Sequence, residues 1–248
     1  MELQDKRAVV YGAAGAMGGA VARAFAREGA TVFLAGRTLA KLDVVAEEIR
    51  ATGGAAETAE VDALDQRAVE EHADEMVKRA GRIDISFNAI SITAVQNVPL
   101  VELSLEEFMT PVTEAARTHF ITATTAAKRM TAQGAGVIVM LSSSAARESR
   151  HRMGGFNLAC AAIEAFTRSL AGEVGRQGVR VVALRPNFTP ETAPGVPVEA
   201  LQPLVKDTLL GRLPRLAEVA GAAVFAASEQ GGAMTGAVVN LTCGAIVD

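Results

Sequence analysis

Residues 8–25 read AVVYGAAGAMGGAVARAF, in which a short apolar run passes through four glycines into an alanine-rich segment. The apolar run predicts a strand over Ala8–Tyr11, and the segment after it predicts a helix over residues 17–28. Glycines at such a turn permit a tight bend and let backbone N–H groups approach a pyrophosphate at the helix N-terminus. The alternative is a turn that only packs a helix onto a strand. The residues that the turn would place against a nucleotide are Gly12, Gly15, Met17 and Gly18.

The same alternation of short β-branched runs and longer helical patterns continues along the chain, which is typical of βαβ units and a parallel sheet. The further predicted strands are Thr31–Ala35, Glu57–Val61, Ile83–Asn88, Gly136–Leu141, Arg180–Leu184 and Ala237–Leu241. The further predicted helices span residues 38–51, 65–79, 104–131, 156–174 and 216–228. We find no repeat and no linker. The pattern therefore predicts one domain over residues 1–248, an α/β doubly wound (Rossmann) fold whose parallel seven-stranded sheet carries helices on both faces.

Composition narrows the class of protein. Half of the residues are apolar and 21% are charged, so the chain can bury a sizeable core. The net charge is −4 and no block of Lys and Arg is present, which argues against nucleic acid as a partner. No apolar run approaches the roughly 20 residues that span a bilayer, and the charged start has no apolar core of a signal peptide. Two distant cysteines suggest no disulfide framework, and no His, Cys and Asp cluster has metal-ligand spacing. We expect a cytoplasmic protein without a metal site.

The end of the second predicted strand concerns the choice of nucleotide. An acidic residue at this tip would bind the ribose 2′-hydroxyl of NAD, whereas this chain has Gly36 followed by Arg37. A guanidinium suits a 2′-phosphate, so we expect NADP(H) in preference to NAD(H). The alternative is that Arg37 is a solvated surface residue.

Five short stretches then carry a family resemblance. GAAGAMG (12–18) resembles a glycine motif, Val61–Asp62 resembles a pair that holds the adenine, and FNAIS (87–91) keeps Asn88 of an Asn-Asn-Ala-Gly motif. VIVMLSSS (137–144) resembles a strand that carries a catalytic serine, and RPNFTPET (185–192) resembles the Pro-Gly loop beside a nicotinamide, with Pro186 retained. Over residues 5–245 the chain resembles the classical, single-domain short-chain dehydrogenase/reductases.

The resemblance implies an NADP(H)-dependent oxidoreductase that acts on the carbonyl or alcohol group of a small molecule. It also implies a homotetramer or homodimer that pairs through the helices predicted at 104–131 and 156–174. The cofactor contacts that it implies lie at Gly12, Gly15, Met17, Gly18, Arg37, Asp62, Asn88 and Pro186.

The catalytic positions of that family are mostly changed here. In the family a tyrosine donates a proton to the carbonyl oxygen, a lysine lowers the pKa of that tyrosine, a serine orients the carbonyl, and an asparagine positions a water molecule. Ser143 matches the serine, but Phe156 stands at the tyrosine position, Cys160 at the lysine position and Ala115 at the asparagine position. Three of these four catalytic residues are therefore absent.

The segment SSSAARESRHRMGG (142–155) offers substitutes. His151 is a candidate proton donor because imidazole changes charge near neutrality, and the alternative is a solvent-exposed histidine. Arg147, Arg150 and Arg152 are candidates for binding a carboxylate or phosphate, or belong to a charged surface loop. Cys160 is either a nucleophile or a small hydrophobic side chain.

Two further segments have simple interpretations. His119 and the threonines of THFITATTAAKRM (118–130) lie on the long helix that pairs subunits in the family, so we expect them at a subunit interface. The segment 187–212 is rich in proline and apolar residues, which predicts a loop that lines a pocket. The substrate is accordingly expected to be anionic if the arginines bind it, or largely apolar.

Three functions remain open at this level. The first is the oxidoreductase with a non-standard, degenerate active site. The second is a catalytically inactive homologue that serves as a scaffold and binds a nucleotide or a partner. The third is non-redox chemistry in the former pocket.

Overall fold

The computed structural model describes residues 1–248. Seven parallel strands form one sheet in the order β3-β2-β1-β4-β5-β6-β7. The strands are β1 (Arg7–Tyr11), β2 (Thr31–Gly36), β3 (Ala55–Glu60), β4 (Ile85–Asn88), β5 (Gly136–Leu141), β6 (Val179–Pro186) and β7 (Ala237–Leu241). The helices are α1 (Ala16–Arg27), α2 (Leu39–Ala51), α3 (Gln66–Ala80), α4 (Leu105–Gln133), α5 (Gly155–Val174), α6 (Val198–Lys206) and α7 (Leu216–Ala227). Single 3-10 turns occur at Leu100–Glu102, Ser144–Ala146, Gly175–Gln177, Pro190–Thr192 and Glu229–Gly231.

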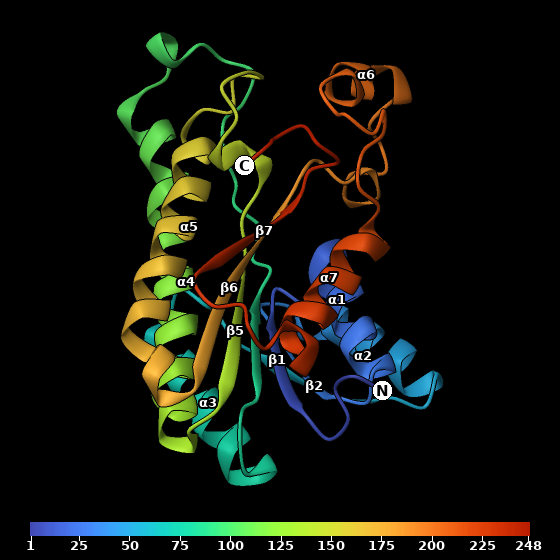
Figure 1. Ribbon diagram of the computed structural model, residues 1–248, viewed down its shortest axis with the longest axis vertical. Helices are drawn as coiled ribbons and strands as arrows, with labels where there is room; N and C mark the ends of the chain where they lie inside the picture. Colours follow the sequence, from blue (N-terminus) through green and yellow to red (C-terminus); the bar gives the residue numbers. More distant parts are fainter.

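Helices cover both faces of the sheet: α1, α2 and α7 lie on one side, and α3, α4 and α5 lie on the other (Figure 1). The predicted fold class is therefore confirmed. Several strand boundaries differ from the prediction by one or two residues. The largest differences are that β3 begins at Ala55, β4 begins at Ile85 and β6 ends at Pro186. Helix α6 was not predicted, because its nine residues include Pro203 and follow a proline-rich stretch that reads as a loop.

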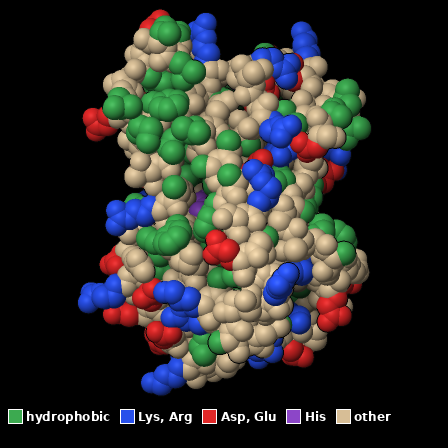
Figure 2. Space-filling view, turned by 60° about the vertical axis from the view of Figure 1, so that its left-hand side comes forward, with side chains coloured by type: hydrophobic (Ala, Val, Ile, Leu, Met, Phe, Trp, Pro, Cys, Tyr) green, Lys and Arg blue, Asp and Glu red, His purple; other side chains and the backbone are tan.

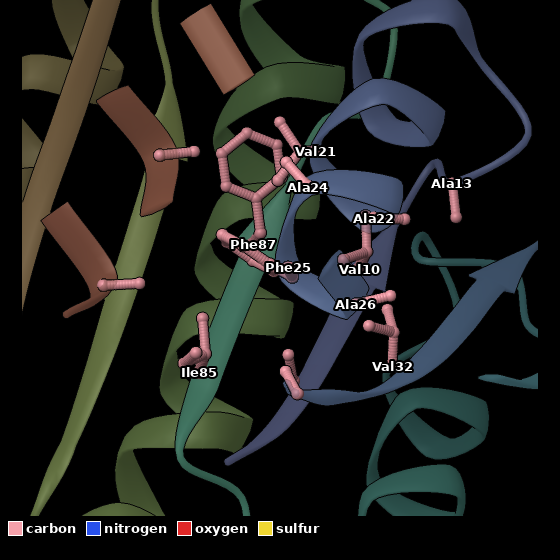
Figure 3. Close-up of a cluster of buried hydrophobic side chains, with 14 of the residues drawn as sticks. Val10, Ala13, Val21, Ala22, Ala24, Phe25, Ala26, Val32, Ile85 and Phe87 are labelled. Carbon is pink, nitrogen blue, oxygen red and sulfur yellow. The ribbon is translucent and has the colours of Figure 1, made fainter. Parts of the chain in front are cut away.

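Helix α1 packs against strand β4 through an aromatic pair. Phe25 of α1 meets Phe87 of β4 edge to face, with ring centroids 6.2 Å apart, and both rings are fully buried. Figure 3 shows them surrounded by small aliphatic side chains such as Val10, Val21 and Ala22. Alanine and glycine on α1 let the helix lie close to the strands, which fixes where the helix N-terminus points.

The sheet topology fixes where a ligand can bind. The chain passes from β3, at one edge, across to β4 on the other side of β1, so β1 and β4 are neighbours with helices on opposite faces. Ligands of open parallel sheets bind outside the carboxyl ends of the strands at such a reversal. The carboxyl ends of β1, β4, β5 and β6 should therefore frame the site.

The long helix α4 corrects one expectation. His119 and the neighbouring Thr122 and Thr125 are almost completely buried within the single chain, so they do not form a subunit interface. The hydroxyl of Thr122 donates to the carbonyl of Thr118, and His119 Nδ1 donates to the carbonyl of Ala115 at 2.9 Å. Burial lowers the pKa of His119 to about 4, so the ring is neutral at neutral pH.

None of the helices combines the length and the apolar character that crossing a bilayer requires.

Candidate active site

Two cavities lie side by side at the carboxyl edge of the sheet. The smaller, of about 440 Å³, begins at the glycine turn after β1, and the larger, of about 670 Å³, lies beyond the ends of β5 and β6. Both are lined by the segment Ala89–Ile92 that follows β4. The two cavities therefore share a wall.

The glycine turn brings backbone close to backbone. Gly12 has φ +76°, and a Cβ there would lie 2.7 Å from the carbonyl oxygen of Ala89. A Cβ on Gly18 would lie 2.3 Å from the oxygen of Gly12. Glycine is thus required at both positions, and helix α1 begins immediately after Gly15 with no acidic residue in its first turn. The first amides of a helix have no intrahelical acceptors, so this end suits a pyrophosphate.

The far end of the smaller cavity is positively charged. Arg37, Thr38 and Lys41 line it after β2, and no acidic residue stands at that strand end. Asp62 lines the opposite wall, where its Oδ1 accepts a hydrogen bond from the Leu64 amide at 3.0 Å. The residues fit an adenosine diphosphate moiety with a cationic pocket at its ribose.

Of the sequence-predicted cofactor residues, Gly12, Gly15, Arg37 and Asp62 line the smaller cavity. Met17 and Pro186 line the larger one. Gly18 and Asn88 line neither. The buried Asn88 side chain donates to Thr122 Oγ1 at 2.9 Å and accepts from the Ile90 amide at 3.0 Å. Asn88 therefore holds the shared wall to helix α4 and need not touch a ligand to matter.

Ser143, which follows strand β5, lines the larger cavity together with Phe156 and Cys160. The Phe156 ring has no ionisable group, so it cannot transfer a proton. Cys160 is buried, and desolvation, aided by the nearby Glu164 carboxylate, raises the pKa of its thiol to about 12. A thiol that stays protonated is a poor nucleophile, so the geometry favours the hydrophobic interpretation of Cys160.

His151 lines the same cavity and its side chain is about one quarter exposed. Its Nε2 donates to Asp207 Oδ2 at 2.8 Å, and its Nδ1 makes no hydrogen bond with the chain. The backbone of His151 has φ +67°, and the next residue, Arg152, has φ +46°. Consecutive left-handed residues other than glycine are uncommon and strained, a state that clusters at functional sites.

The three arginines of this loop do not face the cavity. Arg150 donates to Glu148 Oε1 at 3.0 Å and to Asp207 Oδ1 at 2.7 Å, so its charge is already paired. Arg147 and Arg152 are exposed. The ionisable groups that line the cavity, apart from the Cys160 thiol, are Glu148, His151 and Asp207. Two of these three are acidic, which is unfavourable for an anionic ligand.

A buried ion pair supports the floor of the site. Arg185 of β6 donates through Nε and Nη2 to both oxygens of Glu164 on α5, at 2.7 and 2.8 Å, and both side chains are buried. Ser142 Oγ donates to the same carboxylate at 3.0 Å. Sequence reasoning missed this pair, although Glu164 lies four residues after Cys160 on the mainly apolar buried face of the helix.

Helix α5 also meets α4 at a glycine. A Cβ on Gly155 would lie 1.9 Å from the carbonyl oxygen of Phe108, whereas a Cβ on Gly172, in the same helix, would meet nothing within 4 Å. We expect Gly155→Ala to lower the free energy of unfolding by about 1–3 kcal/mol through overpacking. We expect Gly172→Ala to raise it by about 0.5–1 kcal/mol through a less flexible unfolded chain. Urea unfolding of the two variants checks this, and changes of the same sign would contradict it.

The sheet order and the flanking helices define a protein of the Rossmann fold class. Comparison with known proteins makes this specific: the family model described as enoyl-(acyl carrier protein) reductase matches residues 12–245. The chain is 30% identical to gluconate 5-dehydrogenase of Gluconobacter oxydans, over 99% of this chain and 96% of that protein. It is also 30% identical to an uncharacterized oxidoreductase of Mycobacterium tuberculosis, over 98% and 92% of the two chains. A short-chain type dehydrogenase/reductase from Mycobacterium marinum superposes with a TM-score of 0.86 at 29% identity, covering 97% and 94%.

The chain belongs to the short-chain dehydrogenase/reductase superfamily. Proteins of this superfamily bind NAD(H) or NADP(H), and its oxidoreductases act on small molecules and typically form oligomers.

Proposed function

We propose that this protein is an NADP(H)-dependent oxidoreductase of a carbonyl or alcohol group, in which His151 replaces the missing tyrosine as proton donor. One observation carries the proposal: Ser143 and His151 both line the larger cavity, which shares the wall Ala89–Ile92 with the smaller one. We call the smaller cavity the nucleotide cavity, because the proposal places the cofactor there. The Ser143 hydroxyl and the His151 imidazole therefore line the cavity in which a substrate next to a bound nicotinamide would lie.

The cofactor, when bound, supplies a hydride to the substrate carbon. The residues of the chain do the rest. Gly12, Gly15 and the first turn of α1 bind the pyrophosphate, and Arg37 with Lys41 binds a 2′-phosphate. Ser143 Oγ donates a hydrogen bond that orients the substrate carbonyl. Protonated His151 donates a proton to the carbonyl oxygen and recovers it from solvent, which its partly exposed ring can reach.

The substrate that fits is a small molecule with a largely apolar body. The cavity wall around Ser143 includes Ile92, Leu141, Met153, Phe188 and Leu204. A carboxylate or phosphate on the substrate would meet Glu148 and Asp207, whereas the nearby Arg150 is already paired. Of the two expected substrate classes, we therefore propose the apolar one.

Nucleotide titration tests the proposal. Isothermal titration is expected to give tighter binding of NADPH than of NADH. Arg37→Ala should weaken NADPH binding about tenfold or more, because it removes a charge-assisted hydrogen bond to the 2′-phosphate, and should leave NADH binding unchanged. Arg27→Ala removes an exposed arginine of α1 that lines neither cavity and serves as the control. If neither NADPH nor NADH binds, the oxidoreductase proposal is overturned.

A second candidate function has its own support. The apolar Phe156 and the protonated Cys160 thiol are what a nucleotide-binding scaffold without turnover would carry in a former active site. The scaffold binds NADPH as well, so binding does not separate the two functions. The scaffold function instead predicts that no carbonyl compound leads to oxidation of NADPH. It also predicts that substitutions at Ser143 or His151 leave the function of the protein unchanged.

We further propose that two or four copies associate through α4 and α5. Apolar side chains gather on the face that these helices present (Figure 2), and the exposed ones include Leu105, Met109, Phe120 and Leu158. Phe120 and Phe166 place their rings 6.0 Å apart on neighbouring helices. Two free cysteines are consistent with a reducing compartment, and we propose the cytoplasm.

A further inference from the structure

We propose that Asp207 is a positioning residue that completes the proton donor only when the segment containing α6 covers the cavity. This inference rests on the proposed function of His151. Asp207 follows the last residue of α6, and its carboxylate reaches the loop after the catalytic-serine strand. Oδ2 accepts from His151 Nε2 at 2.8 Å, and Oδ1 accepts from Arg150 Nη1 at 2.7 Å. We call this contact between the α6 segment and the loop the Asp207 clasp.

The loop side of the clasp is rigidly built. Glu148 Oε1 accepts from the amides of Ser149 and Arg150 at 2.9 Å each, and Asn157 Nδ2 donates to the Glu148 carbonyl. The amide of Asn97 donates to the Arg152 carbonyl at 2.8 Å. These bonds hold His151 in its left-handed conformation. Such strain persists only where the surroundings over-determine the backbone, and here they fix the point from which the imidazole extends.

The α6 side of the clasp belongs to the cover of the cavity. Val196, Ala200, Leu201 and Leu204 line the cavity from this segment, and Figure 1 shows α6 standing apart from the sheet and its flanking helices. The segment returns to the body where the Leu210 amide donates to the Cys243 carbonyl at 3.1 Å. Asp207 therefore reaches His151 only while this segment lies over the cavity.

The chemistry of the clasp depends on which ring nitrogen of His151 is bound to the Asp207 carboxylate. Because the carboxylate takes Nε2, the Nδ1 position is the one left for the substrate. The carboxylate accepts from the Nε2–H of the ring before transfer. After transfer from Nδ1 it retains the proton at Nε2, so the neutral ring has one defined tautomer. A covered cavity and a correctly oriented donor thus arise from one contact.

Histidine-selective nitrogen NMR tests the positioning without any substrate. The chain contains three histidines, so ¹⁵N-histidine labelling of the full-length protein with NADPH present gives few ring signals. His151→Asn assigns those of His151. We expect neutral His151 to carry its proton on Nε2 in the wild type, and Asp207→Asn to produce exchange between tautomers. An unchanged tautomer in Asp207→Asn would overturn the inference, whatever the activity.

Turnover provides the second measurement, with NADPH and 1-phenylpropane-1,2-dione as the probe. We expect Asp207→Asn to lower kcat about tenfold and Asp207→Glu to recover part of it. Lys206→Met changes an exposed neighbour that lines neither cavity, and should leave kcat within twofold. Asp207→Asn combined with His151→Asn should be no slower than His151→Asn alone. A double variant slower than His151→Asn would mean that Asp207 acts on the cover and not through His151, and would overturn the inference. If His151→Asn turns over at the wild-type rate, His151 is not the proton donor and the proposed function fails. The NMR measurement then still shows whether Asp207 sets the tautomer of His151.

Discussion

His151→Asn is expected to lower kcat for reduction of a carbonyl compound by NADPH about 10²–10⁴-fold, the usual cost of losing a general acid. Asparagine suits the test because it tolerates the left-handed backbone that this position requires. Its amide also retains hydrogen-bonding capacity toward Asp207, so the loop should stay folded. Since His151 lies outside the nucleotide cavity, the dissociation constant of NADPH should not change.

The neighbouring residue supplies the control for this experiment. Arg152 also has a left-handed backbone, is exposed and does not line the larger cavity, so Arg152→Asn makes the same replacement without touching the donor. We expect wild-type kcat for it, measured as NADPH oxidation at saturating substrate. Equal rates in the wild type and His151→Asn would assign the proton to water or to another group.

Arg185→Met is expected to lower the free energy of unfolding by about 3–5 kcal/mol, because it leaves the Glu164 carboxylate buried without its cation. Glu164 would retain only Ser142 as a partner from the present set of hydrogen bonds. Urea unfolding followed by circular dichroism measures the loss. The folded fraction should still bind NADPH, because neither partner of the pair lines the nucleotide cavity.

Two variants distinguish the buried charge from lost packing. Arg185→Met combined with Glu164→Leu should recover most of the stability, since replacing both partners of a buried pair by apolar residues is often close to neutral. Arg23→Met breaks the more exposed pair with Glu48, whose Arg23 Nε–Glu48 Oε2 distance is 2.7 Å, and should cost less than about 1 kcal/mol. A double variant as unstable as Arg185→Met would point to packing rather than charge.

The fold was predictable because its signals are local and repeated. Each buried parallel strand is a short apolar run, and each crossover helix has its own periodicity, so the alternation alone specifies a doubly wound sheet. The differences occur where that signal is weak. The start of β3, at a sheet edge, consists of Ala55 and Ala56, which have low strand propensity. Helix α6 follows Pro197 and contains Pro203, and these prolines led to its prediction as a loop.

The candidate site was predictable where one motif carries one function. The glycine turn follows from spacing along the chain, and Gly12 and Gly15 line the smaller cavity. The assignment of Ser143, Phe156 and Cys160 to catalytic positions comes from the family resemblance and stays a prediction; the structure places all three at one cavity. Asp207 was not predictable, because it is 56 residues from His151 in the sequence and no periodic pattern marks it. The burial of His119 was also missed, since a helix with polar residues around its circumference does not reveal which of them face the interior of its own chain.

Tyr11 gives this protein an optical property that follows from its position. It is the only tyrosine in a chain without tryptophan. Its buried ring lies at the end of β1, lines the nucleotide cavity and meets His72 edge to face at a centroid distance of 6.4 Å. All tyrosine emission from the protein therefore originates at the wall of one cavity. An adenine entering there would quench a single tyrosine, so occupancy of this cavity can be followed in the unlabelled protein by its tyrosine emission.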